Sequence, residues 1–173
     1  MMTTANKEFG GIDFLINNAG ILRDRTIAKM SLEEWQRVID VNLTGVFNCC
    51  KFGLDIMREE GAIVNLSSIS AMVGFYGQSN YAAAKGGVAS MTKVLARECG
   101  RRNIRVNAVA PGVIDTAMAA QIPQDVRDEM LKNIPLVRFG TPREIADVVL
   151  FLCSPMSSYV NGQIIEVNGG WRG

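Results

Sequence analysis

The sequence predicts a doubly wound parallel α/β sheet, with helices on both faces forming an α/β/α sandwich of three layers. Short apolar runs alternate with longer helical patterns along the chain, as in folds with a parallel sheet. The first three runs lack polar alternation, which is typical of strands covered on both faces. We find no repeat or linker, and 173 residues fit one domain, so we expect a single domain over residues 1–173.

The apolar runs are expected to form four strands. They cover residues 12–17 (IDFLIN), 62–67 (AIVNLS), 104–110 (IRVNAVA) and 163–168 (QIIEVN). The first run begins almost at the N-terminus, so a central place in the sheet would leave one of its edges without a partner. A bare apolar edge favours association between chains.

Helix-start signals separate the strands. Ser31 followed by Glu34 forms the pattern of a capping box, and apolar residues continue from there at helical spacing. Residues 79–101, rich in alanine, predict a second long helix. Thr141 and Pro142 suit the N-cap and first position of another helix, with a glutamate in its first turn.

Composition excludes several classes of function. The chain is 48% hydrophobic and 20% charged with a net charge of +1, which argues against nucleic-acid or membrane-surface binding. It has no histidine, so neither a histidine base nor a histidine metal site can exist. Acid–base chemistry must therefore use tyrosine, lysine or a carboxylate.

The cysteines and the apolar runs indicate a reduced, cytoplasmic setting. None of the four cysteines forms a CxxC pair, and each lies in or beside an apolar stretch, as buried free thiols do. We predict no metal site. No run approaches the ~20 apolar residues of a membrane span, and the N-terminus lacks the pattern of a signal peptide.

The strongest chemical feature is the pair Tyr81 and Lys85 within YAAAK. A spacing of four places both side chains on one helical face. An ammonium beside a phenol favours the phenolate, so we expect Lys85 to lower the pKa of Tyr81 and make it a proton donor and acceptor. The same spacing also occurs by chance on ordinary surface helices.

Polar and turn-forming residues follow three of the predicted strands. Ser68 comes directly after the strand over 62–67, residues 17–20 (NNAG) follow the first strand, and residues 111–116 (PGVIDT) follow the third. Ligands bind at the carboxyl ends of strands in doubly wound sheets, so these segments could converge on one crevice. Ordinary turns and caps are the alternative reading of each segment.

Taken in order, these segments resemble the short-chain dehydrogenase/reductase family, which has a Rossmann-like fold. Within it, the chain is most similar to 3-oxoacyl-[acyl-carrier-protein] reductases and acetoacetyl-CoA reductases. The resemblance covers essentially the whole chain. The matching positions are NNAG at 17–20, Asn42 in DVNLTG, Ser68, YAAAK at 81–85, Pro111-Gly112 and the closing VNGGW at 167–171.

The resemblance implies catalytic roles. Tyr81 would be the general acid in carbonyl reduction, and Ser68 would hold the substrate oxygen. Lys85 would also bind the nicotinamide ribose. Asn42 would kink its helix and position a water that links Lys85 to solvent.

It also implies a cofactor site and a substrate flap. Besides Tyr81 and Lys85, the residues expected to contact the cofactor are Asn18, Ala19, Gly20, Pro111, Gly112, Ile114 and Thr116. Residues 115–135 would form a mobile flap. Within it, Met118, Ile122, Met130 and Leu131 would bind an acyl chain, or form a plainly packed helical face.

The cofactor would be NADP(H) in preference to NAD(H), and the substrate an acyl thioester or similar ketone. Arg23 and Arg25 beside the site could meet an acidic carrier or a phosphate, or be ordinary surface charge. The family is usually tetrameric, so we expect a homo-oligomer, a dimer or tetramer. Alternatives are an epimerase or dehydratase, and a non-catalytic homologue that associates with full-length relatives.

One family feature is missing from this sequence. The chain has no TGxxxGxG turn to bind the pyrophosphate, and residues 1–11 resemble the end of the helix that precedes the family's fourth strand. The chain therefore corresponds to the C-terminal part of the family fold, and we expect it to bind dinucleotides weakly when alone.

Overall fold

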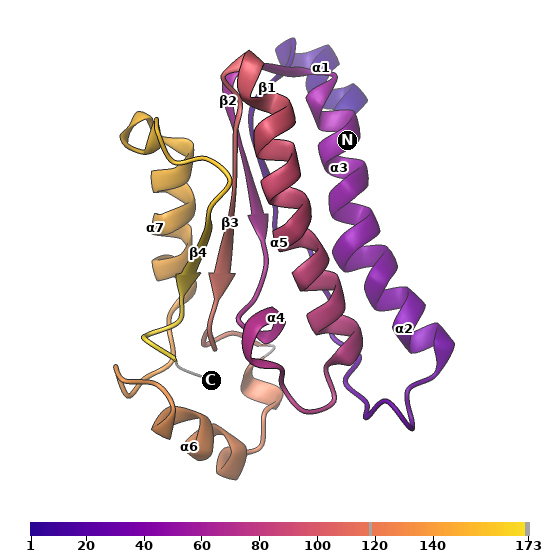
Figure 1. The fold of residues 1–173 in the computed structure, drawn as a ribbon, viewed down its shortest axis with the longest axis vertical. Coiled ribbons are helices and arrows are strands. Elements are labelled where there is room, and N and C mark those ends of the chain that lie inside the picture. The colour runs from indigo at the N-terminus through magenta and orange to yellow at the C-terminus, as the bar shows by residue number, and fades with distance from the viewer. Residues whose placement is uncertain (118, 172–173) are drawn as a thin grey trace.

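A computed structural model describes residues 1–117 and 119–171 of the chain and confirms the α/β class (Figure 1). Four parallel strands form one sheet in the order β1-β2-β3-β4. The strands are β1 (Ile12–Asn17), β2 (Met57–Leu66), β3 (Arg105–Pro111) and β4 (Ile164–Val167).

Helices cover both faces of the sheet. Helices α3 and α5 contact one face, and α7 contacts β2 and β3 from the other face (Figure 1). A π-helical turn at Asp40–Thr44 joins α2 to α3. The helices are α1 (Met2–Phe9), α2 (Leu32–Ile39), α3 (Gly45–Leu54), α4 (Ser70–Val73), α5 (Ser79–Cys99), α6 (Gln124–Lys132) and α7 (Pro142–Cys153).

Most predicted boundaries lie within a few residues of the observed ones, and β1 matches at both ends. The largest difference is at β2, which begins at Met57 rather than at residue 62. This extra portion is irregular, because the β1–β2 register shifts between Ile12 and Phe14 and Glu60 has a φ of 63°. Such an interruption of the strand pattern hides a strand start from sequence inspection.

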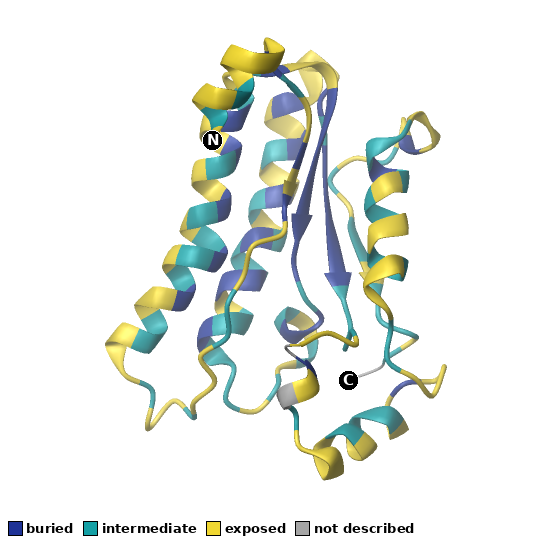
Figure 2. Ribbon diagram, turned by 180° about the vertical axis from the view of Figure 1, so that it is seen from behind, coloured by how far each residue is buried: buried dark blue, intermediate teal, exposed yellow. Residues whose placement is uncertain are grey.

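The core consists of two apolar clusters, one on each side of the sheet. Adjacent residues of β2 point to opposite faces, so Ile63 packs toward α3 and α5 while Val64 packs toward α7. Leu152 of α7 completes the second cluster. The buried residues form continuous runs over 61–66 in β2 and 106–110 in β3, which are the dark parts of the strands in Figure 2.

Strand β1 departs from the expectation of cover on both faces. Leu15 and Asn17 are buried, but Phe14 is 49% exposed and Ile16 is 43% exposed. The reason is that α7 covers only β2 and β3 on that side of the sheet. Within residues 1–117 and 119–171, β1 also has no neighbour along its outer edge, as the sequence suggested.

Both predicted capping boxes are confirmed. The Ser31 hydroxyl accepts a hydrogen bond from Glu34 N at 3.1 Å, and the Glu34 carboxylate accepts one from Ser31 N at 2.9 Å. The same reciprocal pair joins Thr141 and Glu144 at the start of α7. These bonds satisfy backbone N–H groups that the first turn of each helix leaves without intrahelical partners.

The four cysteines are free thiols. Cys50 and Cys99 are buried, whereas Cys49 and Cys153 are half-buried. Burial raises the pKa of Cys50 to about 12, so this thiol stays protonated at neutral pH. Among the helices that the structure describes, none has both the length and the apolar character to cross a membrane.

Candidate active site

The site candidates lie at the carboxyl ends of the strands. The loop after β1, the Ser67–Ser68 segment after β2 and the end of β3 lie at the same end of the molecule, because the strands are parallel (Figure 1). Hydrogen bonds join two of these strand ends, since Ser67 N donates to Val109 O at 2.8 Å and Ile69 N to Pro111 O at 3.1 Å. Helix α5 begins at this end and carries Tyr81 and Lys85.

Lys85 is a buried ammonium group. Its side chain is 3% exposed, and its Nζ donates a hydrogen bond to Leu66 O at 2.6 Å. Nζ lies 5.7 Å from the centroid of the Tyr81 ring. Desolvation by burial lowers the pKa of Lys85 to about 8, so most of the population keeps its charge at neutral pH.

The electrostatics of Tyr81 differ from the prediction. Burial raises the pKa of Tyr81, the Ser68 side chain acts in the opposite direction through hydrogen bonding, and the Asp24 carboxylate raises it further. The net shift is therefore upward, where the sequence predicted a downward one, because desolvation is the largest cause and the Lys85 ammonium is directed to the Leu66 carbonyl. Tyr81 therefore holds its proton at neutral pH.

Two serines directly after β2 tie the strand end to helices α4 and α5. Ser68 Oγ accepts a hydrogen bond from Ser70 N at 3.1 Å, which fixes it at the start of α4. Ser67 Oγ donates to Lys85 O at 3.0 Å and so ties the strand end to the helix that carries Lys85. The sequence did not single out Ser67, because no pattern distinguishes it from the neighbouring Ser68.

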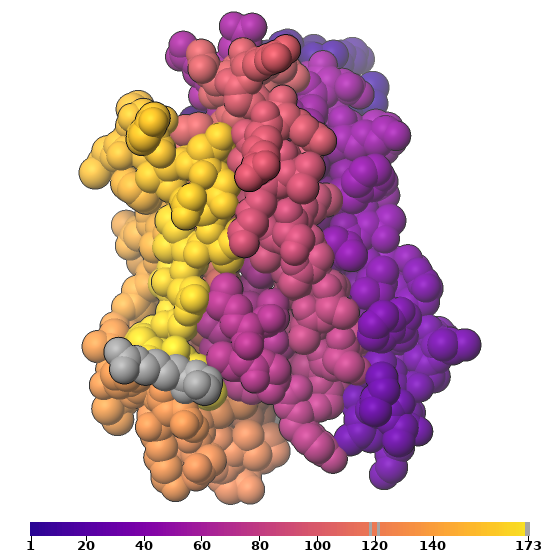
Figure 3. Space-filling view, in the orientation of Figure 1, coloured from indigo at the N-terminus to yellow at the C-terminus, as the bar shows by residue number. Residues whose placement is uncertain are grey.

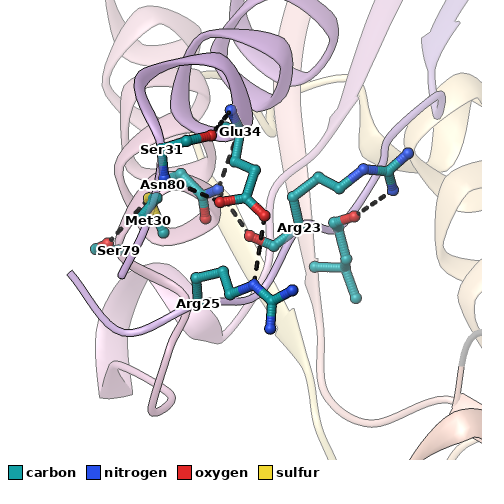
Figure 4. Close-up of polar contacts among 8 residues, drawn as sticks. Arg23, Arg25, Met30, Ser31, Glu34, Ser79 and Asn80 are labelled. Carbon is teal, nitrogen blue, oxygen red and sulfur yellow. Dashed lines mark hydrogen bonds and ion pairs between the residues drawn. The ribbon is translucent and has the colours of Figure 1, made fainter. Parts of the chain in front are cut away.

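Asn80 is a second residue that sequence reasoning missed. It is fully buried, and its Oδ1 accepts a hydrogen bond from Tyr81 N at 2.7 Å. Its Nδ2 donates to Arg23 O at 3.0 Å and to Glu34 O at 3.4 Å (Figure 4). Asn80 therefore fixes the residue that carries the phenol against the loop after β1 and against α2.

Asn42 lies in the π-helical turn, which is the helix distortion expected there. Both ends of its buried amide bond to Ile21: Oδ1 accepts from Ile21 N at 2.8 Å, and Nδ2 donates to Ile21 O at 2.9 Å. A Cβ placed on Gly20 would lie 3.4 Å from Asn42 Oδ1 and 3.6 Å from Lys85 Nζ. The structure thus brings together Gly20, Asn42 and Lys85.

The group around Lys85 offers hydrogen-bond donors to a hydroxyl-bearing ligand. The buried Lys85 ammonium carries three N–H donors, of which one reaches Leu66 O, so a hydroxyl-bearing group suits the donors that remain. Gly20 has no side chain to obstruct an approach to Nζ. Asn18 and Ala19 are exposed on the same loop.

The remaining predicted cofactor positions lie in the segment after β3. A Cβ on Gly112 would lie 2.7 Å from Asn168 Cα, so close packing against the C-terminal segment requires glycine there. Ile114 is half-buried and bridges to Gly140, whereas Thr116 is exposed. The structure does not bring Thr116 into the buried group around Lys85.

The predicted flap over 115–135 contains α6 and a 3-10 turn at Ala119–Gln121. Ile122, Met130 and Leu131 are half-buried, and Met118 lies outside the described residues. Arg127 donates to Ala119 O at 2.9 Å and joins the two parts of the segment. The acyl-chain role of the apolar residues stays a prediction.

Comparison with known proteins identifies the family. A solved structure described as "short-chain dehydrogenase/reductase SDR:glucose/ribitol dehydrogenase" from Brucella melitensis is similar to this chain with a TM-score of 0.95 and 44% identity, over 99% of this chain and 70% of that one. This chain belongs to the short-chain dehydrogenase/reductase family. A family model described as "Enoyl-(Acyl carrier protein) reductase" matches residues 1–172.

Two curated relatives of the family share about half of their aligned residues with this chain. Both are named 3-oxoacyl-[acyl-carrier-protein] reductase FabG. The protein from Thermotoga maritima is 51% identical over 166 residues, which is 95% of this chain and 68% of the relative. The protein from Chlamydia muridarum is 50% identical over 94% of this chain and 66% of the relative. The chain thus spans about two thirds of the length of both relatives.

Proposed function

We propose that the chain provides the catalytic half of an oxidoreductase that reduces a 3-oxoacyl thioester to its 3-hydroxyacyl form. The observation that carries the proposal is the group formed by Ser68, Tyr81 and Lys85 at the carboxyl end of the sheet. The names of the two relatives support the same substrate class.

The side chains supply the proton and orient the carbonyl. The Tyr81 hydroxyl donates its proton to the ketone oxygen as the C–O bond becomes a single bond, and the Ser68 hydroxyl donates a hydrogen bond to the same oxygen. The raised pKa of Tyr81 keeps the phenol protonated before this step. The Lys85 charge stabilises the phenolate that forms after it.

A nicotinamide dinucleotide, when bound, would supply the hydride that the carbonyl carbon accepts. NADPH is the proposed form, by analogy with the family's reductases. Lys85 and Tyr81 would hold its ribose, and residues 18–20, 111, 112, 114 and 116 would line its nicotinamide end.

Reduction of a carbon–carbon double bond is the second candidate, because the matching family model is described as an enoyl reductase. The proximity of two hydroxyls, Ser68 and Tyr81, favours the ketone, since both can act on one carbonyl oxygen. A non-catalytic role through association with full-length relatives has no comparable support.

The chain is also proposed to act as a single domain within a cytoplasmic dimer or tetramer. Exposed apolar side chains on α3 and α5, which are Phe47, Phe52 and Val94, support association. The four free thiols agree with a reducing compartment.

The decisive experiment measures product formation by the purified chain. Acetoacetyl and crotonyl thioesters of N-acetylcysteamine are each incubated with NADPH or NADH, and the products are identified by mass spectrometry. Because the chain is expected to bind dinucleotides weakly, the cofactor is supplied in large excess. We then expect the 3-hydroxy product with NADPH, and a loss of about 10²–10⁴-fold in rate in Tyr81→Phe. Tyr76→Phe is the matched control, because Tyr76 is almost fully exposed.

Each alternative has its own outcome. Formation of the saturated product from crotonyl thioester alone would establish the enoyl reductase instead. If Tyr81→Phe kept the wild-type rate, the proposed proton donor would be wrong. A folded chain that turned over neither thioester would favour the non-catalytic role.

A further inference from the structure

A positively charged, open pocket of about 660 Å³ is formed by the loop after β1 and the start of α2. It is lined by four basic side chains, Arg23, Arg25, Lys29 and Arg37, together with Glu33 and Glu34. The basic residues come from two elements, the loop after β1 and helix α2. They share the end of the molecule that carries α4 and the start of α5, at the lower right of Figures 1 and 3.

Contacts within the pocket leave an excess of positive charge. The Glu34 carboxylate accepts hydrogen bonds from Ser31 N and from Arg25 Nε, the latter at 3.4 Å (Figure 4). Among residues 1–117 and 119–171, Arg23, Lys29 and Arg37 form no ion pair within 4.0 Å. Glu33 is the other carboxylate in the lining.

The loop that carries two of the arginines is fixed to the start of α5. Asn80 donates to Arg23 O, and Arg25 N donates to Gly77 O at 2.9 Å. Asp24, between them, accepts a hydrogen bond from Gln78 Nε2 at 2.9 Å. The pocket is therefore held in a set position relative to Tyr81, one residue beyond Asn80.

We propose that this pocket binds the phosphate of a phosphopantetheine arm, the handle that carries an acyl thioester on both coenzyme A and acyl-carrier protein. The proposal rests on the proposed function. Guanidinium groups form paired, charge-assisted hydrogen bonds to phosphate oxygens. Binding a part of the substrate remote from the ketone would orient the thioester toward Ser68 and Tyr81.

Calorimetry with the full chain tests the proposal directly. The probes are 4′-phosphopantetheine and pantetheine, which differ only in the phosphate. We expect phosphopantetheine to bind at least about tenfold more tightly, with a preference that weakens as salt is added. The triple variant Arg23→Gln, Lys29→Gln, Arg37→Gln should lose this preference.

A second triple variant distinguishes binding at this site from a general effect of positive charge on the protein. Lys93→Gln, Arg97→Gln, Arg101→Gln removes the same charge from exposed positions at the far end of α5 and in the turn after it, and should keep the preference. Equal binding of the two probes by the wild-type chain would overturn the proposal. An equal loss in both triple variants would also overturn it, because the charge alone would then be responsible.

The source of the phosphate is resolved with acetoacetyl-coenzyme A and acetoacetyl-carrier protein as ligands. Weaker binding of both to the first triple variant supports recognition of the shared phosphate. Weaker binding of the carrier alone would overturn it and indicate recognition of the carrier's acidic surface. The phosphate-free N-acetylcysteamine thioester tests the proposed function separately, so the two can fail independently.

Discussion

Burial shifts the pKa values of Tyr81 and Lys85 in opposite directions. Removing the phenol from water raises the pKa of Tyr81, and removing the ammonium lowers the pKa of Lys85 to about 8. At neutral pH both groups therefore hold a proton, and the Lys85 ammonium is a stronger acid than an exposed lysine. Tyr81 therefore carries the proton that ketone reduction consumes, and the Lys85 charge favours its transfer by stabilising the phenolate.

The depressed pKa of Lys85 makes stability depend on pH in a defined window. The pKa of lysine in the unfolded chain is ~10.4. Between about pH 8 and this value, the unfolded chain binds more protons at position 85 than the folded chain does, so stability rises with pH. From pH 7 to pH 9, the wild-type chain should gain about 1 kcal/mol relative to Lys85→Met. Urea unfolding of both proteins at both pH values measures this difference. Titration of the buried thiols lowers stability as the pH rises, and because both proteins contain these thiols, that effect cancels in the comparison.

Lys93→Met serves as the control, because Lys93 is exposed on the same helix. Its stability relative to wild type should stay constant over this pH range. A constant difference for Lys85→Met as well would show that Lys85 titrates normally in the folded chain.

Asn80 provides a test of a buried polar contact. Asn80→Ala removes the partners of Tyr81 N, Arg23 O and Glu34 O together. Leaving these groups without partners should cost about 1–3 kcal/mol, measured as the free energy of unfolding in urea. Ser79→Ala alters the neighbouring half-buried residue and should change stability by less; equal effects would contradict the role of Asn80.

At the scale of elements, side-chain caps set where two of the helices begin. Ser31 opens α2 and Thr141 opens α7, each through a reciprocal bond with the glutamate three residues later. Because α7 is the helix that packs on β2 and β3 from the second face, its start also fixes how the second core cluster is closed.

The N-terminal cap of α7 makes a measurable contribution to the stability of the fold. Thr141→Ala removes the oxygen that accepts from Glu144 N and should destabilise the fold by about 1 kcal/mol. Thr141→Ser keeps that oxygen and should retain most of the stability. Thermal unfolding of the two variants checks the prediction, which fails if serine and alanine have the same effect.

At the scale of the whole molecule, the two faces of the sheet are covered unequally. Helices α3 and α5 span one face, while α7 leaves β1 open on the other (Figure 2). Phe14 and Ile16 lie on this open part next to an edge that is not paired among the described residues. An apolar surface beside a strand edge favours contacts between chains.

We therefore expect the 173-residue polypeptide to self-associate through β1. The double variant Phe14→Glu, Ile16→Glu should shift sedimentation velocity profiles toward smaller species. The matched control is Phe9→Glu, Ile27→Glu, which replaces one phenylalanine and one isoleucine that are more exposed and lie outside the sheet. A profile unchanged by the first variant would contradict this role of β1.

Residue patterns were enough to predict the α/β class, the strand over residues 12–17, both capping boxes and the family motifs around Ser68, Tyr81 and Lys85. These features depend on residue type and on short spacings, which can be read along the chain. The irregular start of β2, the open face of β1 and the contacts of Ser67 and Asn80 became visible in the folded structure alone. There the pKa of Tyr81 is also raised, where the sequence predicted that it is lowered. Burial and hydrogen-bond partners are the cause, because both are supplied by residues far apart in the chain.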